Sequence, residues 1–139
     1  NMVTRARILL ADDHREMRDL VVRLLGQEFD MLEPVVDGRE LLEKASELKP
    51  DVCLLDISMP ILNGIEVAVR LAEGGSNAKI VFLTIHRDWD FVKAALKSGA
   101  SGYVIKTHML SDLHTALREV LAGRTFISPS IHYRQGNVE

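Results

Sequence analysis

This chain lacks the features that mark secreted, membrane-embedded or nucleic-acid-binding proteins. It has one cysteine in 139 residues, so no intrachain disulfide can form, which fits a reducing cytoplasm. We find no signal peptide and no apolar stretch long enough to span a bilayer. The net charge is only −3, without a stripe of Lys and Arg, so general attraction to nucleic acid or anionic membranes is not expected. We therefore expect a cytoplasmic protein with no membrane partner.

The composition predicts one globular domain. Hydrophobic residues make up 47% of the chain and charged residues 27%, and no repeat or low-complexity segment interrupts it. Asn1 precedes Met2 and is interpreted as a cloning remnant, so residues 1–6 are treated as an extension. We expect the domain to span residues 7–123 and residues 124–139 to form a linker-like tail.

Short apolar runs bounded by turn signals predict strands buried on both faces, as in parallel sheets. They occupy residues 7–11, 51–56, 79–84 and 102–106. A further run, residues 31–36, contains Pro34, which an edge strand tolerates and a central strand does not.

Segments with helical periodicity separate these runs. Their apolar stripes are Met17, Leu20, Val21, Leu24 and Leu25; Leu41, Ala45 and Leu48; Ile65, Ala68, Val69 and Ala72; Trp89, Val92 and Leu96; and Leu110, Leu113, Leu117, Val120 and Leu121. Alternating strands and helices predict an α/β fold, a doubly wound parallel sheet with right-handed crossovers. With residues 31–36 at an edge, the expected strand order is 2-1-3-4-5, the flavodoxin-like arrangement.

Polar residues follow four of the predicted strands where each one ends. They are Asp12 and Asp13, Asp56, Thr84, and Lys106. Because open parallel sheets bind ligands at the carboxyl ends of their strands, these side chains are expected to converge. Three carboxylates, a hydroxyl and an ammonium predict a site for a divalent cation and a phosphoryl group.

The chemistry of such a site is consistent with these residue types. Mg²⁺ prefers oxygen ligands and is usually held by one or two carboxylates and a phosphate oxygen. Metal binding relieves repulsion among crowded carboxylates and keeps Asp56 ionised as a nucleophile. Its attack on a phosphoryl group gives an acyl phosphate, a transfer that depends on positioning and on charge neutralisation. Lys106 and Thr84 can each take one phosphoryl oxygen.

Each of these residues also has a purely structural explanation. Asp12 could be the N-cap of a helix beginning near Arg15, and Asp56 could begin a turn. Lys106 could be a solvated strand end, and Thr84 could be chosen for its strand propensity. These explanations leave the joint placement of the residues at strand ends unaccounted for.

The ordered set of motifs resembles the receiver domain of bacterial two-component response regulators, most closely the NarL/FixJ (LuxR-type) subfamily. The supporting segments are Asp12-Asp13-His14 followed by Arg18, Asp56-Ile57-Ser58-Met59-Pro60 leading to Gly64-Ile65-Glu66, Leu83-Thr84, and residues 99–106. The resemblance covers residues 7–123, nearly the whole chain.

The resemblance implies that Asp56 is the phosphoacceptor of a signalling module rather than the nucleophile of a turnover enzyme. The phosphoryl group would come from a sensor histidine kinase, and the domain would catalyse its own phosphorylation and dephosphorylation. Asp13 would be a direct Mg²⁺ ligand and Asp12 would act largely through water, with Asp56 and the carbonyl of Ser58 completing the protein ligands.

The resemblance also implies a switch between Thr84 and Tyr103. Thr84 would move toward the phosphoryl group, and the aromatic ring would turn into the space it leaves. From the sequence alone, Tyr103 is an amphipathic ring on an edge strand, half buried with a solvated hydroxyl. The output face would be formed by the predicted strands at residues 79–84 and 102–106 together with the helix that follows each of them, and phosphorylation could produce a homodimer.

Three positions are expected to border the approach to the phosphoryl group: Ser58, Ile85 and His86. Position 85 is usually small in receivers, so the bulky Ile85 should crowd this approach and hinder water. His86 could instead orient a water molecule. We expect the steric effect to prevail and hydrolysis to be slow.

Further departures concern the end of the domain. Lys106 is followed by Thr107 rather than proline, so no cis peptide is expected. The last helix has no clear N-cap near Met109, so an irregular start is expected. Residues 125–129 resemble a linker to a helix-turn-helix output domain, through which alone DNA would be bound. We expect a receiver cut from a longer transcription factor; the alternative is a stand-alone single-domain regulator.

Two other function classes are considered. Haloacid-dehalogenase-like phosphatases also use an aspartyl phosphate, but they carry a second Asp two residues after the nucleophile, where this chain has Ser58. A degenerate receiver acting only as a scaffold would be expected to have lost Asp56, Lys106 or an acidic partner, and all are present. The phosphorylation-switched module is therefore favoured.

Overall fold

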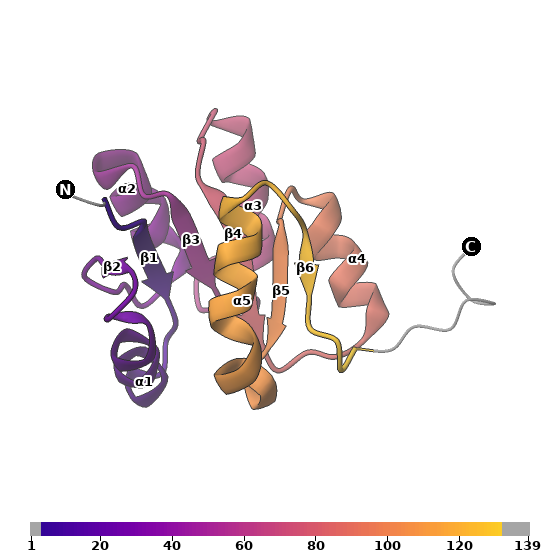
Figure 1. The fold of residues 1–139 in the computed structure, drawn as a ribbon. Coiled ribbons are helices and arrows are strands. Elements are labelled where there is room, and N and C mark those ends of the chain that lie inside the picture. The colour runs from indigo at the N-terminus through magenta and orange to yellow at the C-terminus, as the bar shows by residue number, and fades with distance from the viewer. Residues whose placement is uncertain (1–3, 132–139) are drawn as a thin grey trace.

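The computed structural model describes residues 4–131, which form a six-stranded parallel sheet between two layers of helices (Figure 1). The strands are β1 (Arg7–Ala11), β2 (Asp30–Met31), β3 (Val52–Leu55), β4 (Lys79–Thr84), β5 (Gly102–Ile105) and β6 (Phe126–Ile127). The helices are α1 (Arg15–Leu25), α2 (Gly38–Leu48), α3 (Gly64–Glu73), α4 (Trp89–Lys97) and α5 (Met109–Leu121), with a short 3₁₀ turn, η1 (Lys106–His108), before α5.

The strand order is β2-β1-β3-β4-β5-β6, and all neighbouring strands are parallel. The predicted doubly wound fold and the order of its first five strands are therefore confirmed. The expectation for residues 31–36 is wrong as a continuous strand: β2 has two residues, and only an isolated bridge joins Val35 to Ala11. Pro34, which has no N–H to donate, lies just before that bridge.

β6 lies within the segment expected to be a linker. Phe126 and Ile127 pair with Gly102 and Tyr103, so the outer edge of β5 is covered and β5 is not an edge strand. The expected irregular start of α5 is confirmed, since η1 precedes it and its N-cap, His108, makes no side-chain capping bond. As Thr107 suggested, residues 4–131 contain no cis peptide bond.

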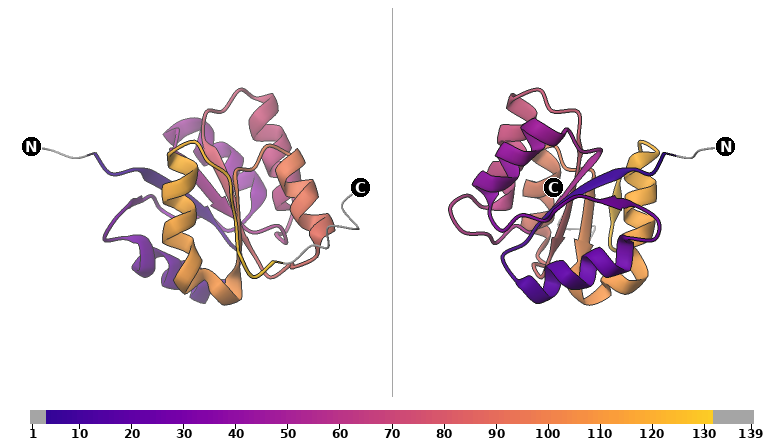
Figure 2. Two further views of the ribbon diagram at one scale, coloured as in Figure 1. Left: turned by 45° about the vertical axis from the view of Figure 1, so that its right-hand side comes forward. Right: turned by 90° about the vertical axis from the view of Figure 1, so that its left-hand side faces the viewer.

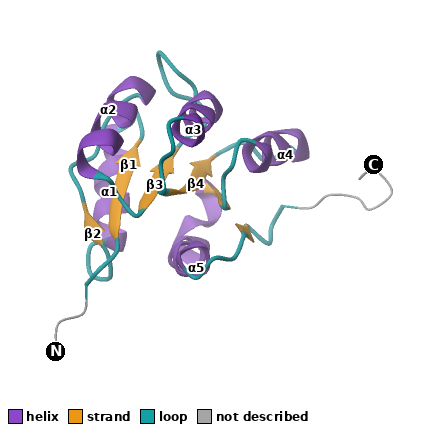
Figure 3. Cartoon of the chain, turned by 90° about the horizontal axis from the view of Figure 1, so that it is seen from above, coloured by secondary structure: helices purple, strands orange, loops and turns teal. Residues whose placement is uncertain are grey.

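The two faces of the sheet carry separate apolar clusters, as the alternation of side chains along a strand requires. On β1, Ile8 and Leu10 belong to the cluster that contains buried residues of α1 and α5, whereas Leu9 and Ala11 belong to the cluster that contains buried residues of α2, α3 and α4. The right-hand view of Figure 2 shows α2 and α3 on one side of the sheet and α1 and α5 on the other. Seen from above, α3 and α4 lie across the row of strands from α5 (Figure 3).

The buried faces of two helices differ from the expected stripes. In α3 the buried residues are Gly64, Val67, Ala68 and Leu71, while Val69 is 38% exposed. In α5, Leu110 is 71% exposed, and Met109 and Ala116 are buried instead. In α5 the buried face thus takes in a terminal and a small residue, whereas in α3 it is shifted along the helix, so that Val67 and Leu71 face the core instead of Val69 and Ala72. No helix within residues 4–131 is long and apolar enough to cross a membrane.

Candidate functional site

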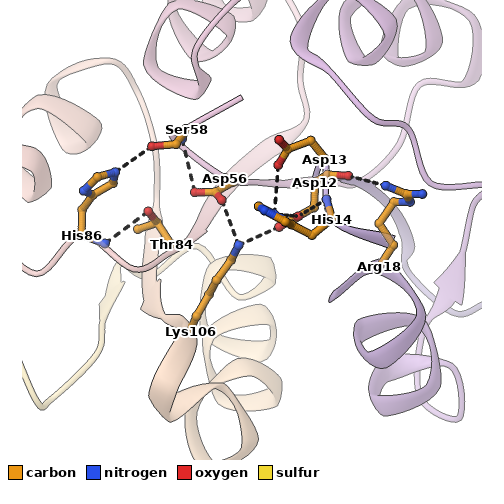
Figure 4. Close-up of polar contacts among 9 residues, drawn as sticks. All are labelled: Asp12, Asp13, His14, Arg18, Asp56, Ser58, Thr84, His86 and Lys106. Carbon is orange, nitrogen blue, oxygen red and sulfur yellow. Dashed lines mark hydrogen bonds and ion pairs between the residues drawn. The ribbon is translucent and has the colours of Figure 1, made fainter. Parts of the chain in front are cut away.

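Lys106 is the central cation of the site that forms where the strands end. Its Nζ lies 2.8 Å from Oδ2 of Asp56 and 2.9 Å from Oδ2 of Asp12. Asp12 follows β1, Asp56 follows β3, and Lys106 follows β5, so three strands position one polar cluster. The convergence is visible in Figure 4, and both carboxylates are buried.

The local electrostatics of Lys106 favour its charged form. Burial alone would lower the pKa of this ammonium, but hydrogen bonds and charge attraction from Asp12 and Asp56 outweigh burial and raise it. The cation therefore remains charged at neutral pH, between two carboxylates that would otherwise repel each other.

Asp12 is held by the start of α1 without capping it. The helix begins at Arg15 with His14 as its N-cap, so the alternative explanation of Asp12 as the cap is wrong. One oxygen of Asp12 accepts from the backbone N–H of His14 at 2.9 Å. The Arg18 guanidinium donates to the carbonyl oxygen of Asp12 at 2.9 Å. These contacts fix Asp12 so that its other oxygen meets Lys106.

The donor atoms beside β1 suit a hard cation. Asp12, Asp13 and His14 each present a potential ligand atom, and these atoms lie within 4.8 Å of one another. Asp13 and Asp12 supply the oxygen ligands that Mg²⁺ prefers, while imidazole suits transition metals better. A third carboxylate, Asp56, is joined to Asp12 by their shared contact with Lys106. Its Oδ1 accepts a hydrogen bond from the Ser58 N–H at 3.3 Å. The predicted ligands are thus gathered at one end of the sheet.

Gly64 determines how closely α3 approaches the loop that follows Asp56. A Cβ at this position would collide with the carbonyl oxygen of Asp56 and with the ring of Phe82. The helix start is fixed by a capping box, in which Asn63 accepts from the Glu66 N–H and the Glu66 side chain accepts from the Asn63 N–H. Asn63-Gly64 therefore allows the loop after Asp56 to turn directly into α3.

Thr84 and Tyr103 are linked through the backbone of His86. The N–H of His86 points at Thr84 Oγ1 over 3.4 Å, and the Tyr103 hydroxyl donates to the His86 carbonyl at 2.9 Å. Tyr103 is completely buried, so the expectation of a half-buried ring with a solvated hydroxyl is wrong. The reason is β6, which covers the edge of β5. Burial, with the nearby charges of Asp56 and Asp88, raises the pKa of the Tyr103 hydroxyl.

His86 also contacts the loop after β3. Its Nε2 lies 2.8 Å from Ser58 Oγ, and its ring stacks on Phe91 with the centroids 4.2 Å apart. Ser58, His86 and Phe91 line a groove of about 680 Å³, together with Asp13 and residues of the β3–α3 loop and α3. Two of the three residues expected at the phosphoryl approach, Ser58 and His86, are thus in direct contact.

Ile85 has a different environment. It is 65% exposed and does not line this groove. Its proposed steric effect on the phosphoryl approach therefore stays a prediction. The stacking of Phe91 on His86 was not foreseen; their spacing of five residues across a helix start was the only sequence signal.

Comparison with known proteins identifies relatives along nearly the whole domain. Residues 8–118 match the family model of the response regulator receiver domain. The chain is 38% identical over 128 residues to the response regulator GacA of Pseudomonas viridiflava, and 35% identical over 128 residues to the nitrate/nitrite response regulator protein NarL of Escherichia coli. These alignments cover 90% and 91% of this chain, but only 59% of each relative, so the chain spans about six-tenths of their length.

A solved structure supports the fold. The two-component response regulator of the LuxR family from Aurantimonas sp. SI85-9A1 superposes with a TM-score of 0.88 at 32% sequence identity. The superposition covers 92% of this chain and 93% of that one.

Proposed function

Because this chain belongs to the response regulator receiver domain family of two-component systems and is similar to its LuxR- and NarL-type members, we propose that Asp56 accepts a phosphoryl group from a sensor histidine kinase. The observation that carries the proposal is the contact of Lys106 with Asp56 and Asp12 at the ends of three strands. In this arrangement a nucleophilic carboxylate lies beside a cation that can also neutralise a phosphoryl oxygen.

The transfer is a displacement at phosphorus. A carboxylate oxygen of Asp56 attacks the phosphorus of phosphohistidine, the P–N bond breaks, and the imidazole leaves with the bond's electron pair and takes up a proton. The product is an acyl phosphate on Asp56. Lys106 neutralises one phosphoryl oxygen, and the buried Thr84 hydroxyl donates to another.

The proposed resident cofactor is Mg²⁺, held by Asp12, Asp13, Asp56 and the carbonyl of Ser58. When bound, it supplies positive charge to a phosphoryl oxygen and offsets repulsion among the carboxylates. The chain's own contribution is to fix Asp12 through His14 and Arg18, and to hold the partly exposed Asp13 beside the same His14 imidazole.

Intact-mass spectrometry after incubation with Mg²⁺ and acetyl phosphate tests this proposal. One added phosphate is expected, and it should be absent after EDTA treatment and in Asp56→Asn. Asp88→Asn, which changes an exposed carboxylate on the β4–α4 loop, serves as the matched control and should still be phosphorylated. Phosphate retained by Asp56→Asn would refute the assignment.

We further propose that phosphorylation acts on self-association or on an output domain that binds DNA. The relatives' greater length supports such an additional domain, which is also the reason that we favour transcriptional output over a stand-alone regulator. Because β6 covers the edge of β5, contacts through α1 and α5, or through α4, are favoured over contacts through that edge. Sedimentation velocity with and without a phosphoryl mimic, on this chain and on a longer one, tests it. Identical assembly and DNA affinity in both states would refute the switch.

A further inference from the structure

Residues 126–131, here called the strap, close the open side of the switch region. Ile127 pairs in register with Tyr103, so the two side chains lie on the same face of the sheet. Ile127 and the buried Ile131 both pack in the cluster that contains the Tyr103 ring. The strap therefore covers the edge of β5 beside the Tyr103 ring.

The strap is joined to β5 by more than strand pairing. The Ser128 N–H donates to the carbonyl of Tyr103 at 2.9 Å, and the Ile105 N–H donates to Ser128 Oγ at 3.0 Å. Ser128 is 1% exposed, so its hydroxyl satisfies a buried donor at the end of β5. Detaching the strap would leave that donor without its partner.

A second connection runs from the strap to the β4–α4 loop. The Arg87 guanidinium donates to the carbonyl of Ser130 at 2.9 Å. The preceding residue, His86, contacts Ser58 through its imidazole and Tyr103 through its carbonyl. Two consecutive loop residues thus contact the phosphoacceptor loop, the switch tyrosine and the strap.

We propose that the strap is a two-state regulatory element that locks Tyr103 inside the core. Phosphorylation of Asp56 tightens the strap, and the His86–Arg87 loop connects the two. This inference rests on the proposed function, because it requires a phosphoryl group on Asp56. A Thr84 hydroxyl drawn toward that group would pull on the loop through the His86 N–H and favour the buried ring. A buried ring in turn keeps Ile127 and Ile131 packed in the same cluster, so the strap stays docked. By reciprocity, a docked strap must strengthen binding at Asp56 by the same factor.

Amide hydrogen exchange of the whole chain, with and without Mg²⁺ and beryllofluoride as phosphoryl mimic, tests the proposal. Fluorine NMR of the bound mimic reports separately whether Asp56 is loaded. On loading, exchange at the Ser128 and Ile105 amides should slow by about threefold or more, since both donate within the strap contact.

Arg87→Ala should abolish this slowing while the mimic still binds. Arg5→Ala is the matched control, because Arg5 is an exposed arginine that donates to backbone carbonyls of Gly26 and Gln27, far from the strap. It should leave the slowing intact. Ile131→Ala, which loosens the strap by a different route, should weaken beryllofluoride binding measured by titration.

The outcomes separate the two proposals. Absence of a bound-fluoride signal in the unaltered chain would refute the proposed function itself. A bound signal with unchanged exchange at Ser128 would overturn the strap proposal and leave the phosphoacceptor assignment standing. Equal slowing in Arg87→Ala and Arg5→Ala on loading would likewise overturn the strap proposal alone.

Discussion

Nζ of Lys106 lies 2.8 Å from Oδ2 of Asp56, and this contact joins the carboxyl ends of β3 and β5, which are separated in the sheet by β4. Lys106 thus has a structural task in addition to its proposed catalytic one. Its positive charge offsets the negative charges of two buried carboxylates, Asp12 and Asp56. Within residues 4–131, no other cationic side chain contacts Asp56.

Replacing Lys106 by Met should therefore destabilise the fold by about 1–3 kcal/mol, because Asp12 and Asp56 would be left without their buried counter-charge. Urea denaturation measures the loss. Adding Mg²⁺ should stabilise this variant more than the unaltered protein. Lys93→Met, which removes an exposed ammonium 3.7 Å from Asp90, is the control and should change stability by less than about 0.5 kcal/mol. Equal effects of the two variants would show that the Lys106 contacts are energetically no different from a surface pair.

Ile85→Ala should speed dephosphorylation by a few-fold, about 1 kcal/mol on the barrier, if the side chain hinders water at the approach to Asp56. The measurement is the decay of radiolabelled protein after removal of the phosphodonor. Leu110→Ala removes a comparably exposed apolar side chain from the start of α5 and should leave the rate unchanged. An unchanged or slower decay in Ile85→Ala would show that this side chain points away from the approach to Asp56 and that the steric prediction is wrong.

Ile61 lies in the β3–α3 loop at φ 73° and is 62% exposed. A β-branched residue in the left-handed region is strained, and Ile61 gains little burial to offset the strain. Ile61→Gly should raise the free energy of unfolding by about 1 kcal/mol. Ile85→Gly, at an equally exposed isoleucine outside the positive-φ region, should lower it by about 0.5–1 kcal/mol. Denaturant titration distinguishes the two signs, and destabilisation by both would contradict the strain.

Stability should fall at alkaline pH. Burial raises the pKa of the Cys53 thiol from 9.0 to about 12, so the folded state holds a proton that the unfolded state releases. The resulting stabilisation is complete below pH 9 and is lost as the pH rises toward 12. Burial of Tyr103 acts in the same direction. In Cys53→Ala the free energy of unfolding should depend less steeply on pH above 9, and an unchanged slope would contradict this assignment.

A thiol reagent gives a check on the same residue that does not depend on unfolding curves. Cys53 lies within β3 and is buried, so it should react slowly at pH 8 in the native state and completely in urea. Rapid labelling of the native protein would show that β3 opens far more often than its burial implies.

The strands that carry the site could be predicted because their signal is local. Apolar runs such as residues 79–84 define their own length, and the polar residue that ends each run lies where a parallel sheet collects its ligands. This is why the Asp12, Asp56 and Lys106 contacts follow from sequence, although their distances do not. The roles of individual residues in binding metal or phosphate remain predictions.

The surroundings of Tyr103 could not be predicted in the same way. Its burial depends on the two-residue strand Phe126–Ile127, which Pro129 closely follows. A strand this short shows no periodicity in the sequence. Similarly, the close approach of α3 to the loop after Asp56 depends on Gly64, where a Cβ would meet the Asp56 carbonyl and the Phe82 ring. Contacts of this kind are set by packing, which a pattern of apolar residues does not specify.

The pairing of β6 with β5 also affects what the sheet can do to its neighbours in solution. An uncovered strand edge offers a row of free N–H and C=O groups. Another chain can pair with this row as an added strand, which leads to aggregation. Here one margin of the sheet is β6, a two-residue strand that ends at Ile127, and the opposite margin is β2, which is equally short and is followed three residues later by Pro34. Within residues 4–131, neither margin of the sheet offers a long edge to a strand of a second molecule. Short edges of this kind disfavour aggregation by sheet extension, so association through side-chain surfaces is the expected alternative.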